Sequence, residues 1–168
     1  MFNKRIVFTI FALVAFFGLG TGTAWAQPTT DTVVVTYEVT AVTQINLNGA
    51  ASVTIVAGTP GSGLPSVTDS SGVTYDITNN AGAESMRLTG KIDIAMPANT
   101  TLSVSVTAPS GAVSAGFVDL TATDQDLVTG IDNVDEAAVA ISFRLAATVA
   151  AGVLSSATKT FTMTIVAT

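Results

Sequence analysis

Six carboxylates lie within residues 119–136 with no lysine or arginine between them: Asp119, Asp124, Asp126, Asp132, Asp135 and Glu136. Hard cations such as Ca²⁺ take several oxygen ligands, and clustered carboxylates can supply them. Asp124 and Asp126 have the spacing that opens a calcium loop, although an EF-hand has its next ligand where this chain has Val128. The stretch therefore predicts either a Ca²⁺ site built on Asp124, Asp126 and Asp132, or a solvated acidic loop without a ligand.

Other chemistries fit the composition less well. Paired carboxylates could serve glycoside hydrolysis, but residues 27–168 contain only five aromatic side chains, and the three phenylalanines (Phe117, Phe143, Phe161) are predicted to face inward. The chain has no His and no Cys, so its abundant Ser and Thr hydroxyls lack their usual base, and no G-x-S-x-G elbow occurs. We therefore expect a non-catalytic protein, with Ca²⁺ as the only cofactor considered.

The first 26 residues indicate a secretory signal peptide. A positive start at Lys4 and Arg5 precedes an apolar run over residues 6–20, and a small-x-small cleavage site ends at Ala26. The remaining 142 residues carry four basic and twelve acidic side chains, a net charge of −8. This charge disfavours nucleic acid and anionic membranes as partners, and no transmembrane segment is predicted in the mature form.

A period of two dominates residues 27–168 and predicts β-strands separated by Gly, Pro and Asn turns. Strands are expected at residues 33–47, 51–57, 73–78, 86–94, 102–108, 115–121, 137–149 and 159–167. The Asn-Gly pair at residues 48–49 is a strong hairpin signal and should join the first two of these strands. Residues 58–71 and the acidic residues 123–136 are expected as connections, the second with a helical turn around Asp126.

Because no convincing amphipathic helix occurs in residues 27–168, the expected fold class is all-β. We predict one domain over residues 27–168, an antiparallel β-sandwich of about 7–9 strands, immunoglobulin-like or jelly-roll-like in topology. The absence of Cys means that core packing must stabilise this domain without disulfides.

The first predicted strand is unusually long. Its apolar face alternates over about 15 residues, roughly 50 Å, whereas typical strands have about 5–6 residues. Such a segment either bends between two sheets or extends beyond its own domain. A free segment of this kind can complete another subunit's sheet, because its main chain supplies hydrogen bonds and its alternate side chains fill pockets. Residues 27–47 are therefore predicted either as an N-terminal donor strand or as an ordinary first strand.

Four features define a resemblance: the leader, the Thr/Val/Ala/Ser composition, the alternation over residues 33–47 and the predicted strand that runs to the C-terminus. The chain resembles small secreted bacterial surface proteins of the pilin or spore-coat-U-like β-sandwich type, although it lacks the cysteines common in chaperone-assembled pilins. The resemblance implies a structural role in a filament, pilus or coat.

We therefore expect a secreted, extracellular or cell-surface structural protein, exported through the periplasm, that assembles with itself or with other surface proteins by β-strand addition. The residues predicted to form the subunit-joining strand are Val33, Val35, Tyr37, Val39 and Ile45. The alternative is an extracellular module that binds carbohydrate or Ca²⁺ through residues 119–136.

Overall fold

The computed structural model describes residues 30–70, 72–82 and 85–168, so the predicted signal peptide lies outside the described residues. The chain divides into two units, Met1–Tyr37 and Glu38–Thr168. All ten described strands belong to the second unit: β1 (Thr43–Asn48), β2 (Val67–Asp69), β3 (Thr74–Asn79), β4 (Met86–Ile92), β5 (Thr100–Val106), β6 (Val113–Ser114), β7 (Phe117–Asp119), β8 (Gln125–Ile131), β9 (Val134–Ala147) and β10 (Phe161–Ala167). One 3₁₀ turn, η1 (Val149–Ala151), is the only helical element in the described ranges, so the all-β prediction is confirmed.

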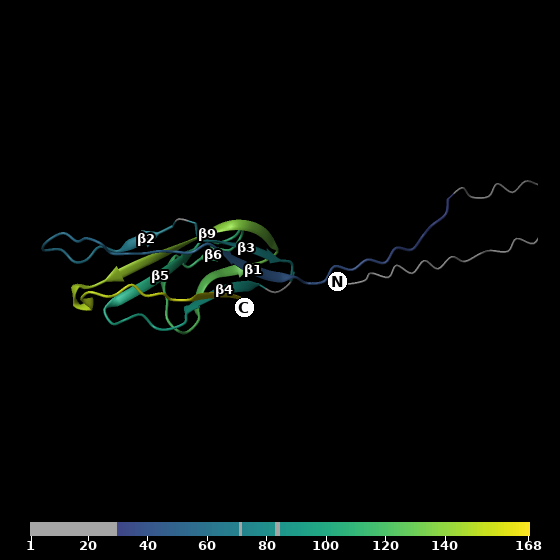
Figure 1. Cartoon of the computed structure of the whole chain (residues 1–168). Helices are drawn as coiled ribbons and strands as arrows, with labels where there is room; N and C mark the ends of the chain where they lie inside the picture. The colour runs from purple at the N-terminus through teal and green to yellow at the C-terminus, as the bar shows by residue number, and fades with distance from the viewer. Residues whose placement is uncertain (1–29, 71, 83–84) are drawn as a thin grey trace, which may run out of the picture. The chain divides into compact units, whose positions relative to one another are not determined.

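Two antiparallel sheets form the sandwich. The six-stranded sheet has the order β1-β3-β9-β5-β7, with β2 also paired to β9, and the four-stranded sheet has the order β10-β4-β8-β6. The 14-residue strand β9 organises the larger sheet, because β3 pairs with its first half and β2 with its second half (Figure 1). Its other edge pairs with β5 over residues 141–147.

The core lies between the inward faces of the two sheets, where alternate side chains are buried as the period of two predicts. Phe143 of β9 and Phe161 of β10 join the sheets by an edge-to-face contact, with ring centroids 5.3 Å apart. The fully buried Tyr75 donates its hydroxyl hydrogen bond to the carbonyl of Thr107 at 2.7 Å. Burial, and secondarily the negative charge of Glu136, raise the pKa of Tyr75, so the phenol stays protonated in its place in the core.

The predicted hairpin at residues 48–49 is wrong. Strand β1 pairs with β3, with Leu47 opposite Tyr75, and residues 51–57 form no strand. Gly49 nevertheless has a positive φ of 88°, and a Cβ at this position would lie 2.1 Å from the carbonyl oxygen of Gly72. The glycine therefore permits a close approach of two backbone segments. An Asn-Gly pair in the sequence looks the same whether it serves such an approach or a two-residue turn.

Two predicted connections contain strands. The short strand β2 lies within residues 58–71, and residues 123–136 form β8 and the start of β9 instead of a loop with a helical turn. Leu127, Val128 and Ile131 explain the second error, since they are buried and outweigh the charged residues around them. Of the strand predicted at residues 115–121 the structure has only the three-residue β7, and the two-residue β6 lies just before this range.

The long first strand is observed only over β1. Residues 30–42 belong to no strand, although the alternation of apolar side chains begins at Val33. A strand requires a hydrogen-bonded neighbour, and the described part of this single chain provides none for residues 33–39. The strand predicted for residues 33–39 is therefore not found among the residues that the structure describes.

Candidate subunit-joining segment

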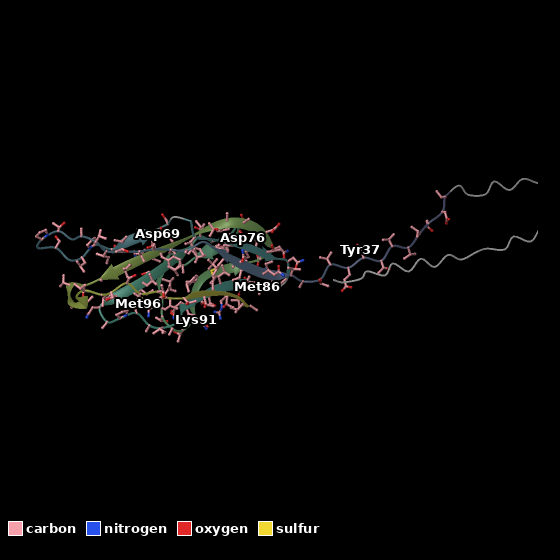
Figure 2. The ribbon with its side chains drawn as sticks, viewed as in Figure 1. Tyr37, Asp69, Asp76, Met86, Lys91 and Met96 are labelled. Carbon is pink, nitrogen blue, oxygen red and sulfur yellow. The ribbon has the colours of Figure 1, made fainter. Side chains whose placement is uncertain are left out.

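Residues 33–39, which we call the N-terminal segment, expose nearly all of their apolar surface. The exposed fractions are 84% for Val33, 72% for Val35, 88% for Tyr37 and 82% for Val39; Tyr37 is labelled in Figure 2. Single exposed apolar side chains are common on proteins, but a continuous exposed row marks an interaction site. In an extended chain these four residues share one face, because successive side chains point to opposite sides.

The fifth predicted joining residue, Ile45, lies elsewhere. It is half-buried in β1 and packs against the core of its own sandwich. The structure thus separates the sequence-predicted set into four exposed residues in the N-terminal segment and one residue that belongs to the fold.

Asn80 holds the backbone between the segment and β1. Its backbone N–H donates to the carbonyl of Val42 at 3.0 Å, and its side-chain oxygen accepts from the N–H of Val42. Its side-chain nitrogen donates to the carbonyl of Thr40 at 3.2 Å. Since Asn80 follows the last residue of β3, its amide continues the hydrogen bonding of β3 along residues 40–42. This role of Asn80 was not predicted from the sequence, because an Asn in a predicted turn gives no indication of hydrogen-bond partners about forty residues away.

Asp76 anchors β1 to the rest of its sheet. Its carboxylate accepts hydrogen bonds from the side chain of Asn48 in β1 at 3.0 Å and from the backbone N–H of Ala138 in β9 at 2.9 Å (Figure 2). Ala138 has a positive φ of 54° at a bulge where the β3–β9 register shifts between Tyr75 and Ile77. The hydrogen bonds from Ala138 and then from Asn48 lower the pKa of Asp76, and those from Ser110 lower the pKa of Glu136.

These lowered pKa values predict the pH dependence of stability. A carboxylate whose pKa is lower in the folded chain stabilises the fold above its unfolded pKa of about 4, and this contribution is lost as the pH falls through its folded pKa. We expect Asp76→Asn to melt below the unmodified protein at pH 6, with a difference that shrinks below about pH 4. Circular dichroism melts from pH 2 to pH 7 measure the difference.

The control for this measurement is Asp31→Asn, which changes a carboxylate that lies before β1 and accepts a hydrogen bond from its sequence neighbour Thr32. Its melting difference from the unmodified protein should stay near zero at every pH. A difference for Asp76→Asn that is the same at pH 6 and pH 3 would show that the charge of Asp76 does not stabilise the bulge.

Two of the acidic residues proposed as calcium ligands form ion pairs with basic side chains. Asp124 accepts from Lys91 at 3.3 Å and Asp126 accepts from Arg87 at 3.2 Å, so each faces a basic side chain of β4. No group of three acidic side chains that could hold a metal ion occurs in the part of the chain that the structure describes. The calcium prediction, which included Asp132, therefore gains no support from the geometry, and these exposed pairs contribute at most about 1 kcal/mol each.

The prediction that all three phenylalanines face inward is wrong for Phe117. Phe143 is buried and Phe161 half-buried, whereas Phe117 lies exposed on the edge strand β7. The guanidinium carbon of Arg144 lies 4.2 Å from the centre of its ring. This cation–π contact covers one ring face, which explains why an aromatic side chain is tolerated at a short edge strand.

Comparison of the chain with protein-family models, curated proteins and solved structures gives no match. The class that the structure defines is an all-β sandwich of two antiparallel sheets. Among the residues that the structure describes, no helix has the length and apolar character needed to span a membrane.

Proposed function

We propose that this protein is a secreted, non-catalytic structural subunit of the cell surface that assembles by β-strand addition, with the N-terminal segment as the donor strand. The observation that carries the proposal is the exposed, alternating apolar row Val33, Val35, Tyr37 and Val39, which has no strand partner among the residues that the structure describes. The core cluster contains no residue of this segment, which supports a partner in another molecule for its apolar face.

The energetics favour an added strand over a simple hydrophobic contact. Burial of four such side chains contributes about 6–12 kcal/mol at about 1.5–3 kcal/mol each. Association costs about 4–15 kcal/mol in lost translational and rotational freedom. The side chains alone are therefore barely sufficient, and the main-chain hydrogen bonds of a new ladder supply the remaining stabilisation.

The surrounding sequence supports a location outside the cell. The predicted leader over residues 1–26 supports export, and the acidic charge of residues 27–168 keeps unassembled subunits soluble by mutual repulsion. We do not favour the alternative of a Ca²⁺-binding module, because Asp124 and Asp126 already face Lys91 and Arg87.

The test is direct imaging of the mature protein, residues 27–168. Electron microscopy should show ordered filaments, and light scattering should rise with concentration above a threshold. A chain that lacks residues 27–41 should remain unpolymerised. Monodisperse monomer over a wide concentration range would contradict the proposal.

A further inference from the structure

We propose that the groove between β1 and β10 of a second copy of this chain accepts the N-terminal segment, an inference that rests on the proposed function. The groove has a volume of about 510 Å³ and lies where the edge strand of one sheet faces the edge strand of the other. Its apolar lining comes from Ile45, Ile77, Met163 and Ile165. Ile45 of β1 and Ile165 of β10 are only half-buried, so inward side chains of both edge strands are accessible from the groove.

The four sheet edges differ in how they are protected. On one side of the fold the edge strands β6 and β7 have only two and three residues, which leaves few free backbone groups. On the groove side, β1 has six residues and β10 has seven, and neither contains a proline or a charged side chain. Natural sheets shorten, charge or cover their edges to prevent uncontrolled pairing. Two long unprotected edges around one apolar groove indicate that another strand covers them.

The N-terminal segment matches this site in length and pattern. Seven extended residues span about 23 Å, the same as the seven residues of β10. If the segment pairs with the free edge of β10, its row of Val35, Tyr37 and neighbours points into the groove. Its other face, which includes Thr36, then lies beside Thr162 and Thr164 of β10, which are exposed; Thr164 also borders the groove. Threonine pairs across neighbouring strands are favourable.

The backbone just before β1 disfavours a turn that would bring the chain's own segment back to its own groove. To pair with a neighbouring edge it would have to reverse direction within residues 40–42, between Val39 and the first residue of β1. These three residues are Thr, Ala and Val, none of which favours the positive φ of a tight turn. The bonds from Asn80 to Thr40 and Val42 also hold this stretch against reversal. A second copy is therefore the occupant that the geometry favours.

Disulfide trapping tests the inference in the full mature chain, which has no natural cysteine. Thr36→Cys is combined with Thr162→Cys in one variant and with Thr164→Cys in another, so that a register shift of two residues is covered. The control pairs Thr36→Cys with Val113→Cys, an exposed residue on β6 at the opposite edge of the same sheet. All four substituted positions are exposed, so the fold should be retained, which circular dichroism checks.

After mild oxidation under assembly conditions, we expect the β10 variants to give a ladder of covalent oligomers on a denaturing gel. At least one of them should contain about ten times more cross-linked material than the Val113→Cys control. Filaments with equal or stronger trapping at Val113→Cys would overturn the groove while leaving strand addition intact. A disulfide that forms within single chains would show that the groove is filled by the chain's own segment, and would overturn the inference that a second copy fills it. Absence of any assembly in light scattering would overturn both the groove and the proposed function.

Discussion

Aspartate at both Val35 and Tyr37 is expected to abolish assembly while the sandwich stays folded. Both side chains are exposed in the single chain, so the change removes no core contact and should leave the melting temperature unaltered. In an added strand both would be buried, and the loss of two apolar groups at about 1.5–3 kcal/mol each weakens subunit association by about 10²- to 10⁴-fold. Burial of two unpaired carboxylates weakens it further.

The threshold concentration for assembly, determined by light scattering and sedimentation, measures this effect. The matched control places aspartate at Thr32 and Thr36, which add the same charge to the opposite face of the extended segment. The control should raise the threshold by less than about tenfold, since its side chains stay in water and only repel one another. Equal thresholds for both double variants would show that the alternating face has no role in joining subunits.

The second large effect is expected for stability. Gly49→Ala should destabilise the sandwich by about 2–5 kcal/mol, the combined cost of a positive φ in a residue with a Cβ and of overpacking. The new Cβ would lie 2.1 Å from the carbonyl oxygen of Gly72, a backbone atom that cannot move like a flexible side chain. For a domain of this size the melting temperature should fall by on the order of 10 °C.

Gly61→Ala is the matched control, because Gly61 also has a positive φ, of 80°, but a Cβ there would meet no atom within 4 Å. Its melting temperature should fall only by the amount that the backbone conformation requires, about 1–2 kcal/mol of stability. If the two variants melt together, the close approach of Gly49 to Gly72 does not stabilise the fold. Thermal melts followed by circular dichroism make this comparison.

The two largest effects concern neighbouring parts of the chain. Gly49 follows β1, and β1 borders the groove that we propose as the acceptor. The N-terminal segment precedes the same strand. In the proposed assembly the donor segment continues into β1, which borders the acceptor groove, so that a subunit which receives a segment also presents its own.

The alternation of apolar and polar residues was enough to predict several strands without knowledge of the strands that pair with them. Strands β3, β4, β5, β9 and β10 lie close to their expected residues, because alternate apolar side chains of each strand pack in or against the core. The same rule failed for β8, where Asp124 and Asp126 suggested a loop. Their neutralising partners, Lys91 and Arg87, come from β4, more than thirty residues away, and no local pattern contains that information.

The sequence by itself determined that the chain forms β-strands, that residues 33–39 carry an apolar face, and that no disulfide stabilises the fold. Only the tertiary structure decided that β1 pairs with β3 and that Ile45 belongs to the core. It also showed that Val33, Val35, Tyr37 and Val39 are exposed and belong to no strand. The physical reason is that a period of two specifies which face of a strand is buried but not which strand lies beside it. Many strands of similar pattern could pair, and the choice depends on packing across the whole sandwich.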